Sequence, residues 1–88
     1  MKTFVSKGLP VRFGFLLLNR FTLLSLSAAV EPLRMANRVC GGTNYSWKMI
    51  SESGESVTAS DGIEVKVNYS VQDRDVLKDV DIIVVCGG

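Results

Sequence analysis

The run from Ile82 to Val85 is the feature that most constrains this chain. It reads IIVV, four consecutive β-branched apolar residues, and Cys86, Gly87 and Gly88 follow it. β-Branched residues favour strands, and a strand that is apolar on both faces is typical of a parallel sheet covered by a layer on each side. We therefore predict a buried strand in the middle of a parallel sheet. A position at the outer rim of the sheet, or a helix, would argue against this prediction and against what is built on it.

Two earlier segments and the residues between them predict a strand, a helix and a second strand. The stretch 11–18 (VRFGFLLL) is almost continuously apolar, and 45–51 (YSWKMIS) alternates and is rich in strand formers. Between them, apolar residues recur at intervals of three and four from Leu23 to Asn37, which predicts a helix capped near Thr22. This order predicts a right-handed βαβ unit.

Pro32 lies inside the helical pattern. Proline lacks an amide donor and crowds the preceding turn, so we expect either a kink near Ala28 and Ala29 or a new helix that starts at Glu31. The glycine pair at 41–42 predicts the end of the helix.

The segment between the second strand and the final strand is polar and rich in turn formers. Residues 52–55 predict a turn, and 57–59 with 63–67 predict a small hairpin or an edge excursion. A single helical turn could form within 70–81, but the many charges of that segment more simply indicate a solvated connection.

Composition limits the chemistry that these 88 residues can perform. Ten Lys and Arg stand against nine Asp and Glu, a net charge of +1, so the strong positive field of a nucleic-acid reader is absent. The chain has no histidine, which excludes Ser-His-Asp, Cys-His and histidine-containing zinc sites. Cys40 and Cys86 are too few for a disulfide-dense secreted scaffold and too far apart for a CxxC pair. We therefore predict reduced thiols in a cytoplasmic protein, with no metal site and no cofactor.

The first thirty residues imitate a secretory signal, because basic residues precede an apolar stretch that ends in small residues at 27–29. Asn19 and Arg20 interrupt that stretch, and neither piece approaches the roughly 18 to 20 residues that span a bilayer. We therefore predict neither export nor a membrane span, and treat 1–10 as an amino-terminal arm.

Residues 11–88 are predicted to be the first part of a larger α/β domain, because one long helix cannot cover both faces of a buried parallel sheet. In open α/β sheets the ligand crevice lies outside the carboxyl ends of the strands. Asn19 and Phe21, after the first strand, and Gly87 and Gly88, after the last, are therefore candidate ligand contacts.

Ordinary structural roles compete with these assignments. Phe21 could be an apolar contact at the entry to the helix, and the diglycine could be a plain turn after a strand. Without Cβ atoms, however, the diglycine backbone can turn sharply and direct its amides at a ligand. Glu31, Arg34 and Arg38 are better explained as a solvated, salt-bridged helix face than as a site.

The chain resembles a known family in three segments taken in order: FLLLNRFTLLSLSAAVEPLRMANR at 15–38, VTASDGI at 57–63 and DIIVVCGG at 81–88. The family is the PfpI/ThiJ-like domain, a class I glutamine amidotransferase-like fold, in its GlxA-type branch. In that branch the domain precedes an AraC-type DNA-binding module in bacterial transcription regulators. The resemblance implies an α/β fold, a flavodoxin-like three-layer α/β/α sandwich with a mainly parallel sheet, of which only the amino-terminal half is present here.

The resemblance also implies where a catalytic site would lie in the family's enzymes. They use a cysteine on a strand-to-helix elbow, which would fall beyond Gly88, and an acid from the first helix. Aligning Leu23 and Leu24 with the family's Leu-Leu-Asp segment places Ser25 at the position of the acid. A hydroxyl can bind a ligand but cannot supply carboxylate acid–base chemistry. Ser25 could equally be a mid-helix serine bonded to its own backbone, and Cys86 stands where many family enzymes have proline.

The expectation is therefore a non-catalytic ligand-sensing domain with no catalytic residues. Its candidate ligand contacts are Asn19, Phe21, Ser25, Gly87 and Gly88. The expected partners are a small nitrogenous effector, a second copy in a homodimer, and DNA reached only through a downstream helix-turn-helix module. The alternatives are a cysteine-dependent hydrolase, hydratase or amidase of the PfpI/ThiJ type, and a small flavodoxin-like module that binds no ligand.

Overall fold

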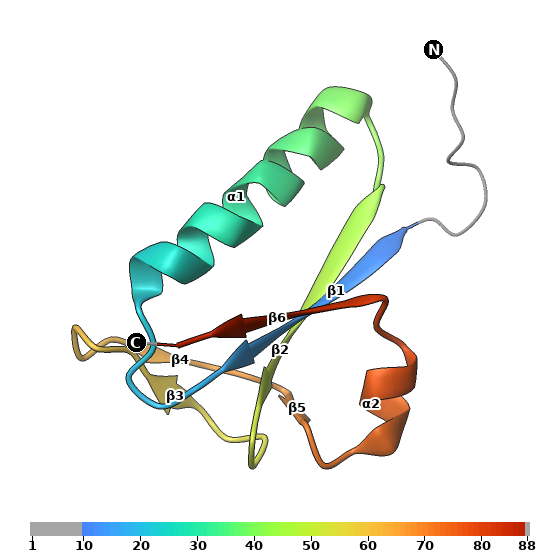
Figure 1. The fold of residues 1–88 in the computed structure, drawn as a ribbon. Helices are drawn as coiled ribbons and strands as arrows, with labels where there is room; N and C mark the ends of the chain where they lie inside the picture. Colours follow the sequence, from blue (N-terminus) through green and yellow to red (C-terminus); the bar gives the residue numbers. More distant parts are fainter. Residues whose placement is uncertain (1–9, 88) are drawn as a thin grey trace.

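The chain folds around a parallel sheet, in which the first strand makes the most extensive pairing (Figure 1). The computed structural model describes residues 10–87. The strand order is β5-β2-β1-β6, and every pairing in this sheet is parallel. The strands are β1 (Val11–Leu17), β2 (Tyr45–Ser51), β5 (Tyr69–Ser70) and β6 (Ile82–Cys86). A separate antiparallel hairpin is formed by β3 (Val57–Thr58) and β4 (Glu64–Val65).

These elements confirm most of the expected order. The strands predicted at 11–18 and 45–51 are β1 and β2, and the predicted hairpin is the β3–β4 pair. The expected sandwich is confirmed only as far as an α/β fold with a parallel sheet. The predicted arm falls almost entirely on residues 1–9, which lie outside the described part of the chain.

Of the two alternatives for 70–81, the single helical turn is confirmed, because the segment contains the short helix α2 (Arg74–Lys78). The preferred alternative, a connection without a helix, is wrong, although most of its residues are exposed. Asp73 caps α2, its side-chain oxygen accepting a hydrogen bond from the Asp75 amide at 3.0 Å. The many charged residues of this segment favoured a solvated connection in the sequence analysis. In the structure, the Asp73 cap and the buried Val76 stabilise the helix.

The predicted central position of Ile82 to Val85 is wrong for the described residues. The run forms the parallel strand β6, but β6 lies at the edge of the sheet, because β1 fills one side and no described strand pairs with the other. Ile82, Ile83 and Val85 are 43%, 45% and 58% exposed. Apolar residues on both faces reveal what a strand could bury, not which neighbours it has. The edge position removes one argument for the family resemblance, which therefore needs support from similarity to other proteins.

The core lies on the face of the sheet that α1 (Leu23–Cys40) and the hairpin cover. Phe15, Leu17 and Phe21 are fully buried or nearly so, and Leu26 is the buried residue of α1. The remaining buried members of this cluster are Val57, Ala59, Val67 and Cys86. Removing this apolar surface from water supplies the main stabilisation, about 25 cal/mol for each Å² buried.

The opposite face of the sheet is partly covered by α2 and the residues that follow it (Figure 1). Gly14 in β1 faces this side, where a Cβ atom would lie 2.9 Å from Cδ1 of Ile50, 3.1 Å from Cδ1 of Ile83 and 3.2 Å from Cγ1 of Val80. Glycine therefore permits these side chains to close over the strand.

Helix α1 runs from Leu23 through Pro32 without a second start, so the predicted new helix at Glu31 is wrong. The predicted end is confirmed. Gly41 adopts a left-handed conformation with φ 71°, and the amides of Gly41 and Gly42 donate to the last carbonyls of the helix.

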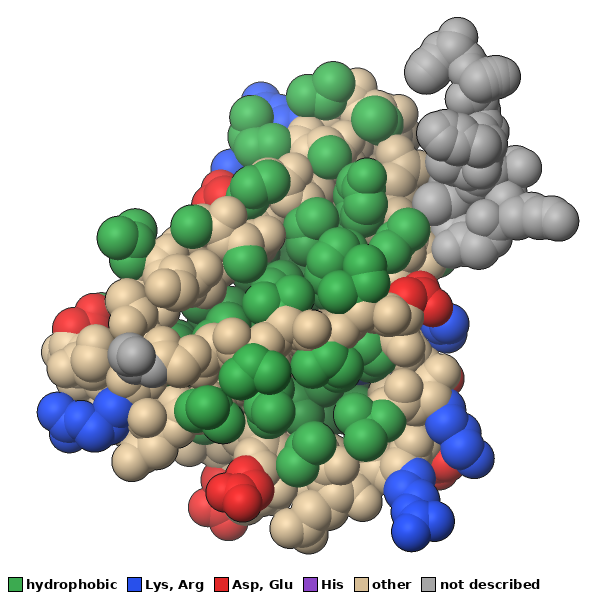
Figure 2. Space-filling view, in the orientation of Figure 1, with side chains coloured by type: hydrophobic (Ala, Val, Ile, Leu, Met, Phe, Trp, Pro, Cys, Tyr) green, Lys and Arg blue, Asp and Glu red, His purple; other side chains and the backbone are tan. Residues whose placement is uncertain are grey.

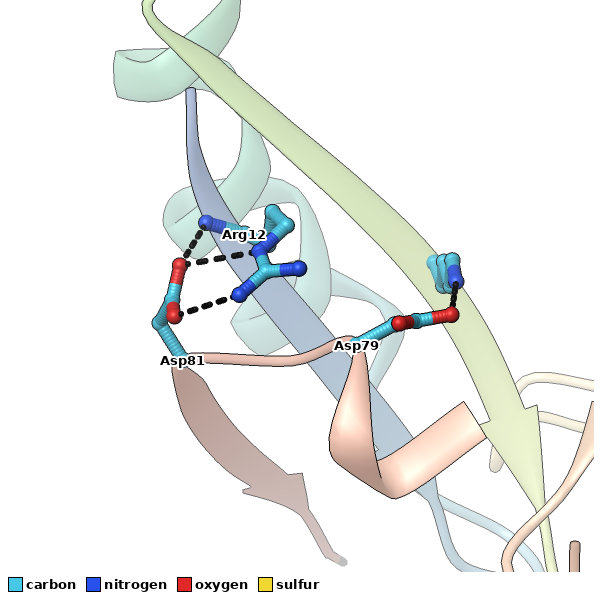
Figure 3. A network of polar contacts seen from close by, with 4 residues as sticks. Arg12, Asp79 and Asp81 are labelled. Atoms are coloured by element: carbon cyan, nitrogen blue, oxygen red, sulfur yellow. Dashed lines mark hydrogen bonds and ion pairs between the residues drawn. The ribbon is translucent and has the colours of Figure 1, made fainter. Parts of the chain in front are cut away.

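Arg12 and Asp81 join the start of β1 to the start of β6 (Figure 3). The Arg12 amide donates to Oδ2 of Asp81 at 2.8 Å, and its guanidinium donates to both carboxylate oxygens at 3.0 and 3.2 Å. The Asp81 amide donates back to the Arg12 carbonyl at 2.7 Å. Beside this pair, Lys48 lies 3.8 Å from Asp79. These bonds set the register of the edge strand.

The Arg12 side-chain hydrogen bonds, and then the Arg12 amide, lower the pKa of Asp81 below its ordinary value of 3.8. A lowered folded-state pKa stabilises the fold above the ordinary value, and this contribution is lost as pH falls through the lowered value. We expect Asp81→Asn to lower the Tm at pH 7 and to reduce the dependence of Tm on pH below about 4. Thermal melts between about pH 2 and 7 would measure it. Glu64→Gln, which removes a charge from an exposed hairpin residue, is the control, and equal effects of the two changes would contradict the assignment.

The exposed β6 edge predicts self-association. Unpaired strand edges flanked by exposed apolar side chains template pairing with another chain. We expect the chain to be poorly soluble or to associate, and Val85→Lys to raise the monomeric fraction in sedimentation velocity. Gln72→Lys adds the same charge to an exposed residue away from the edge and should change little. A monomeric wild-type chain with a sharp, cooperative melt would contradict the prediction.

Candidate functional site

Residues 18–22, which connect β1 to α1, are fastened to the end of β6 by backbone hydrogen bonds. The Leu18 amide donates to the Cys86 carbonyl at 3.0 Å, and the Thr22 amide donates to the Gly87 carbonyl at 3.1 Å. The carboxyl ends of two neighbouring parallel strands therefore meet at the start of α1. This is the edge of the sheet at which open α/β folds place their ligands.

The same connection is fastened to the hairpin on its other side. The Arg20 amide donates to the Thr58 carbonyl at 2.9 Å, and the Ser60 amide donates to the Phe21 carbonyl at 2.8 Å. Arg20 adopts φ 63°, the one described non-glycine residue with positive φ. Such a conformation costs a non-glycine residue about 1–2 kcal/mol, so the hydrogen bonds on both sides must hold it in place.

A cavity of about 260 Å³ lies where β1 and β2 end. Three short segments line it: the end of β1 and the residues after it, the end of β2 and the turn after it, and the first strand of the hairpin. The lining residues are Leu17, Leu18, Asn19, Ser51, Glu52, Ser53, Glu55, Ser56, Val57 and Thr58. The cavity is slightly smaller than the roughly 300–1,000 Å³ of drug-sized ligand pockets, which suits a small metabolite.

Ser51 shapes the part of this cavity formed by the turn after β2. Its side chain is 3% exposed, its hydroxyl donates to the Glu55 carbonyl at 2.8 Å, and its oxygen accepts from the Gly54 amide at 2.9 Å. Both bonds tie the turn to the last residue of the strand. The buried hydroxyl of Ser51 therefore helps to hold the turn that contains Glu52 and Glu55, together with the Ser70 hydroxyl, which donates to the Glu52 carbonyl at 2.9 Å.

The cavity is lined by both apolar and acidic residues. Leu17, Leu18 and Val57 supply apolar surface, while Glu52 and Glu55 supply carboxylates. No lysine or arginine is among the lining residues. Ionised carboxylates accept hydrogen bonds and attract positive charge, so this arrangement suits an uncharged or positively charged ligand that carries N–H donors.

The five predicted contacts do not all come together. Asn19 lines the cavity. Phe21 is 0% exposed in the core, a position that fits the alternative of an apolar contact at the helix entry. Ser25 and Gly87 lie at the start of α1, away from the cavity lining, and Gly88 is outside the described residues.

Most of the cavity lining was not predicted as a site. Ser51, Glu52 and Glu55 belong to a segment that the sequence marks only as the end of a strand and a polar turn. The signal that could have identified these residues is the position of their turn in the sheet. The turn follows β2, which lies next to β1 in the same parallel sheet. Carboxyl ends of adjacent parallel strands share one edge.

Cys86 is poorly disposed as a nucleophile. It is buried, and burial raises the pKa of its thiol, which favours the unreactive protonated form. Cys40 is exposed at the last position of α1, away from the cavity lining. Within residues 10–87 no three acidic or cysteine side chains gather in a way that could hold a metal ion. In the same range, no helix is both long and apolar enough to cross a bilayer.

Sequence comparison finds similarity to segments of bacterial transcription regulators. The chain is 46% identical over 79 residues to the HTH-type transcriptional regulator GbdR of Pseudomonas aeruginosa, and 38% identical over 76 residues to CdhR of the same species. It is 41% identical over 54 residues to GlxA of Rhizobium meliloti. These alignments cover 90%, 86% and 61% of this chain, which spans only about a fifth of each regulator (21%, 21% and 17%). No family model matches the chain.

Structural comparison also finds similarity to a bacterial transcription regulator. A crystal structure of an AraC family transcriptional regulator from Pseudomonas putida superposes with a TM-score of 0.80 and 30% sequence identity. The match covers 90% of this chain and 41% of that one. The similarity to regulators of the AraC and HTH types is therefore carried by both sequence and fold.

Replacing Ser51 should loosen the turn that lines the cavity. We expect Ser51→Ala to destabilise the chain by about 1–3 kcal/mol, because the Gly54 amide and the Glu55 carbonyl lose their shared partner. Chemical denaturation would measure the difference. Ser53→Ala is the matched control and should cost less, because it removes one hydrogen bond of 3.3 Å, which the exposed Ser53 hydroxyl oxygen accepts from the Glu55 amide. Equal losses from both changes would contradict the role given to Ser51.

Proposed function

We propose that this chain is part of the effector-sensing domain of an AraC-type transcription regulator, and that its cavity binds a small metabolite without transforming it. The observation that carries the proposal is the 46% identity to an HTH-type regulator across 90% of the chain. The superposition on an AraC family regulator at a TM-score of 0.80 supports it independently. A PfpI/ThiJ-like, flavodoxin-like sandwich is the proposed form of the complete domain.

The cavity supports a nitrogenous effector. Asn19 offers an amide, and Glu52 and Glu55 offer acceptors for N–H groups, beside the apolar surface of Leu18 and Val57. An amine or amide with a short apolar part would match both kinds of lining residue. Ser25 and Gly87 stay in the proposal as contacts made from the start of α1 and the end of β6, and Gly88, which is outside the described residues, stays with them. Phe21 does not, because it is fully buried in the core.

A binding role fits these residues better than catalysis. Ser25 is a hydroxyl where the family's enzymes carry an acid, and it cannot share an acidic proton with a neighbouring thiol. Cys86 is buried with a raised pKa, so it is a poor nucleophile. A cysteine-dependent hydrolase, hydratase or amidase would need its nucleophile from residues that are not in this chain.

DNA contact is proposed to come from a helix-turn-helix module outside these residues, because their net charge of +1 provides no basic surface of the required strength. A homodimer and a cytoplasmic location are part of the same proposal. The coding sequence around this segment provides the direct test. We expect a helix-turn-helix pair to be encoded downstream of the Gly88 codon, and its absence would reject the regulator proposal.

Effector binding should stabilise the chain, because a ligand that binds only the native state raises its stability by about 2.7 kcal/mol at 100 times its Kd. We expect a small amine or amide from a screened panel to raise the Tm by roughly 4–8 °C for each kcal/mol, and carboxylates of similar size to have no effect. Differential scanning fluorimetry would measure both groups of compounds.

Variants of the lining residues test whether the ligand binds in the cavity. Asn19→Ala and the double change Glu52→Gln with Glu55→Gln should abolish the rise in Tm, while Glu64→Gln on the hairpin should retain it. A rise that survives the cavity changes would place the ligand elsewhere. No rise with any compound would favour an interaction module that binds no ligand.

A further inference from the structure

Leu18 differs from the other apolar residues that line the cavity, because its side chain is not part of the core. Leu17 and Val57 also line the cavity, but they are 1% and 9% exposed and belong to the core cluster, whereas Leu18 is 43% exposed. Shortening a core side chain leaves a void that destabilises the fold, while a half-exposed side chain can change size at much lower cost. Of these three residues, Leu18 is therefore the one that can set the size of a ligand while the core stays intact.

The backbone of Leu18 is held independently of its side chain. Its amide donates to the Cys86 carbonyl at 3.0 Å, and its carbonyl accepts from the Phe21 amide at 3.0 Å. A substitution that shortens the side chain leaves both hydrogen bonds available. Such a change alters the wall of the cavity and not the path of the chain.

The Leu18 side chain lies between the cavity and the carboxyl end of β6. In the sheet, β1 has β2 on one side and β6 on the other, and Leu17 of β1 pairs with Cys86 of β6. The next residues along the chain are Leu18 and Gly87, and a Cβ atom on Gly87 would lie 3.9 Å from Cδ1 of Leu18. The cavity lies toward β2, whose last residue and following turn line it. Leu18 therefore separates the cavity from Gly87.

The space beyond Leu18 is open and bordered by apolar surface. Apart from the chain neighbours of Gly87, Leu18 is the one described residue within 4 Å of the Cβ position on Gly87. Figure 2 shows exposed hydrophobic side chains on both sides of β6, and Val85, two residues before Gly87, is 58% exposed. A shorter side chain at position 18 would join this surface to the cavity.

We propose that Leu18 is a specificity-determining residue, whose side chain closes the cavity toward β6 and limits the length of the apolar part of a bound amine. This role rests on the proposed function, because it requires the ligand to bind in the cavity. Glu52 and Glu55 attract the nitrogen from the turn after β2. An alkyl chain that runs from this nitrogen toward Leu18 gains about fourfold in affinity for each methylene that it buries. Methylenes that Leu18 keeps in water add nothing.

A homologous series of linear primary amines, from ethylamine to octylamine, tests this limit. NMR titration would give the Kd of each amine from the amide signals of Asn19 and Ser53, which both line the cavity. In the wild-type chain, affinity should rise about fourfold per methylene and then level off. In Leu18→Ala, which replaces an isobutyl group by a methyl group, the rise should continue for about two or three more carbon atoms. Leu77→Ala is the matched control, because Leu77 is 39% exposed on α2 and outside the cavity lining, and it should level off at the wild-type length.

Two further variants check the same wall. Leu18→Val removes less of the side chain, so it should extend the rise by about one carbon atom, and it serves as the test if Leu18→Ala does not fold. Adding Gly87→Val to the Leu18→Ala chain places a branched side chain in the space that the leucine left. The limit should then return to near the wild-type length.

Three results would overturn the role of Leu18 and leave the proposed function standing, because in each of them the amines still move the cavity signals. They are an unchanged limit in both Leu18→Ala and Leu18→Val, a limit that Leu77→Ala shifts as far as Leu18→Ala does, and an extended limit that persists after Gly87→Val is added. Amines that move no cavity signal in any of the chains would reject the nitrogenous effector, and with it the role of Leu18.

Discussion

Parallel pairing of β1 on both sides is the constraint from which the rest of the structure follows. β1 is registered with β2 from Val11 to Leu16 and with β6 from Phe13 to Leu17. All three strands therefore end at one edge of the sheet, and the connection to α1 must leave from that edge. Its backbone hydrogen bonds to β6 and to the hairpin complete the corner. The cavity, the start of α1 and the end of β6 are neighbours because parallel strands share an edge.

Two apolar surfaces remain on this unit, and they differ in kind. The edge and faces of β6 present unpaired backbone groups together with Ile83 and Val85, so they suit the addition of a strand and a covering layer. Helix α1 leaves Leu24, Met35 and Val39 exposed, and these side chains suit packing against another helix. In the similar AraC family structure, the matched region accounts for 41% of the chain. The two surfaces thus describe two separate kinds of contact, one made through backbone pairing and one through side chains alone.

The cavity draws its character from segments that are far apart in sequence. Asn19 follows β1, while Ser51, Glu52 and Glu55 close the end of β2 more than thirty residues later. Reasoning from strand ends predicted Asn19, because any crevice at that edge must pass the first loop. It missed the glutamates because a polar turn of this composition is ordinary on a protein surface. Only the adjacency of β1 and β2, combined with the bonds of Ser51, makes that turn one side of a cavity.

The sequence by itself determined that β1, β2 and β6 are strands, that the segment between β1 and β2 is a long helix, where this helix ends, and that no histidine chemistry is available. These properties are local: apolar spacing, β-branching and a glycine with positive φ act within a few residues of one another. Tertiary structure alone decided that β6 lies at the edge, that Phe21 is core, and that apolar side chains of α1 such as Leu24 and Val39 stay exposed. An apolar residue reports that burial would stabilise it, but the partner that buries it is chosen by how the elements pack, and that information is not local.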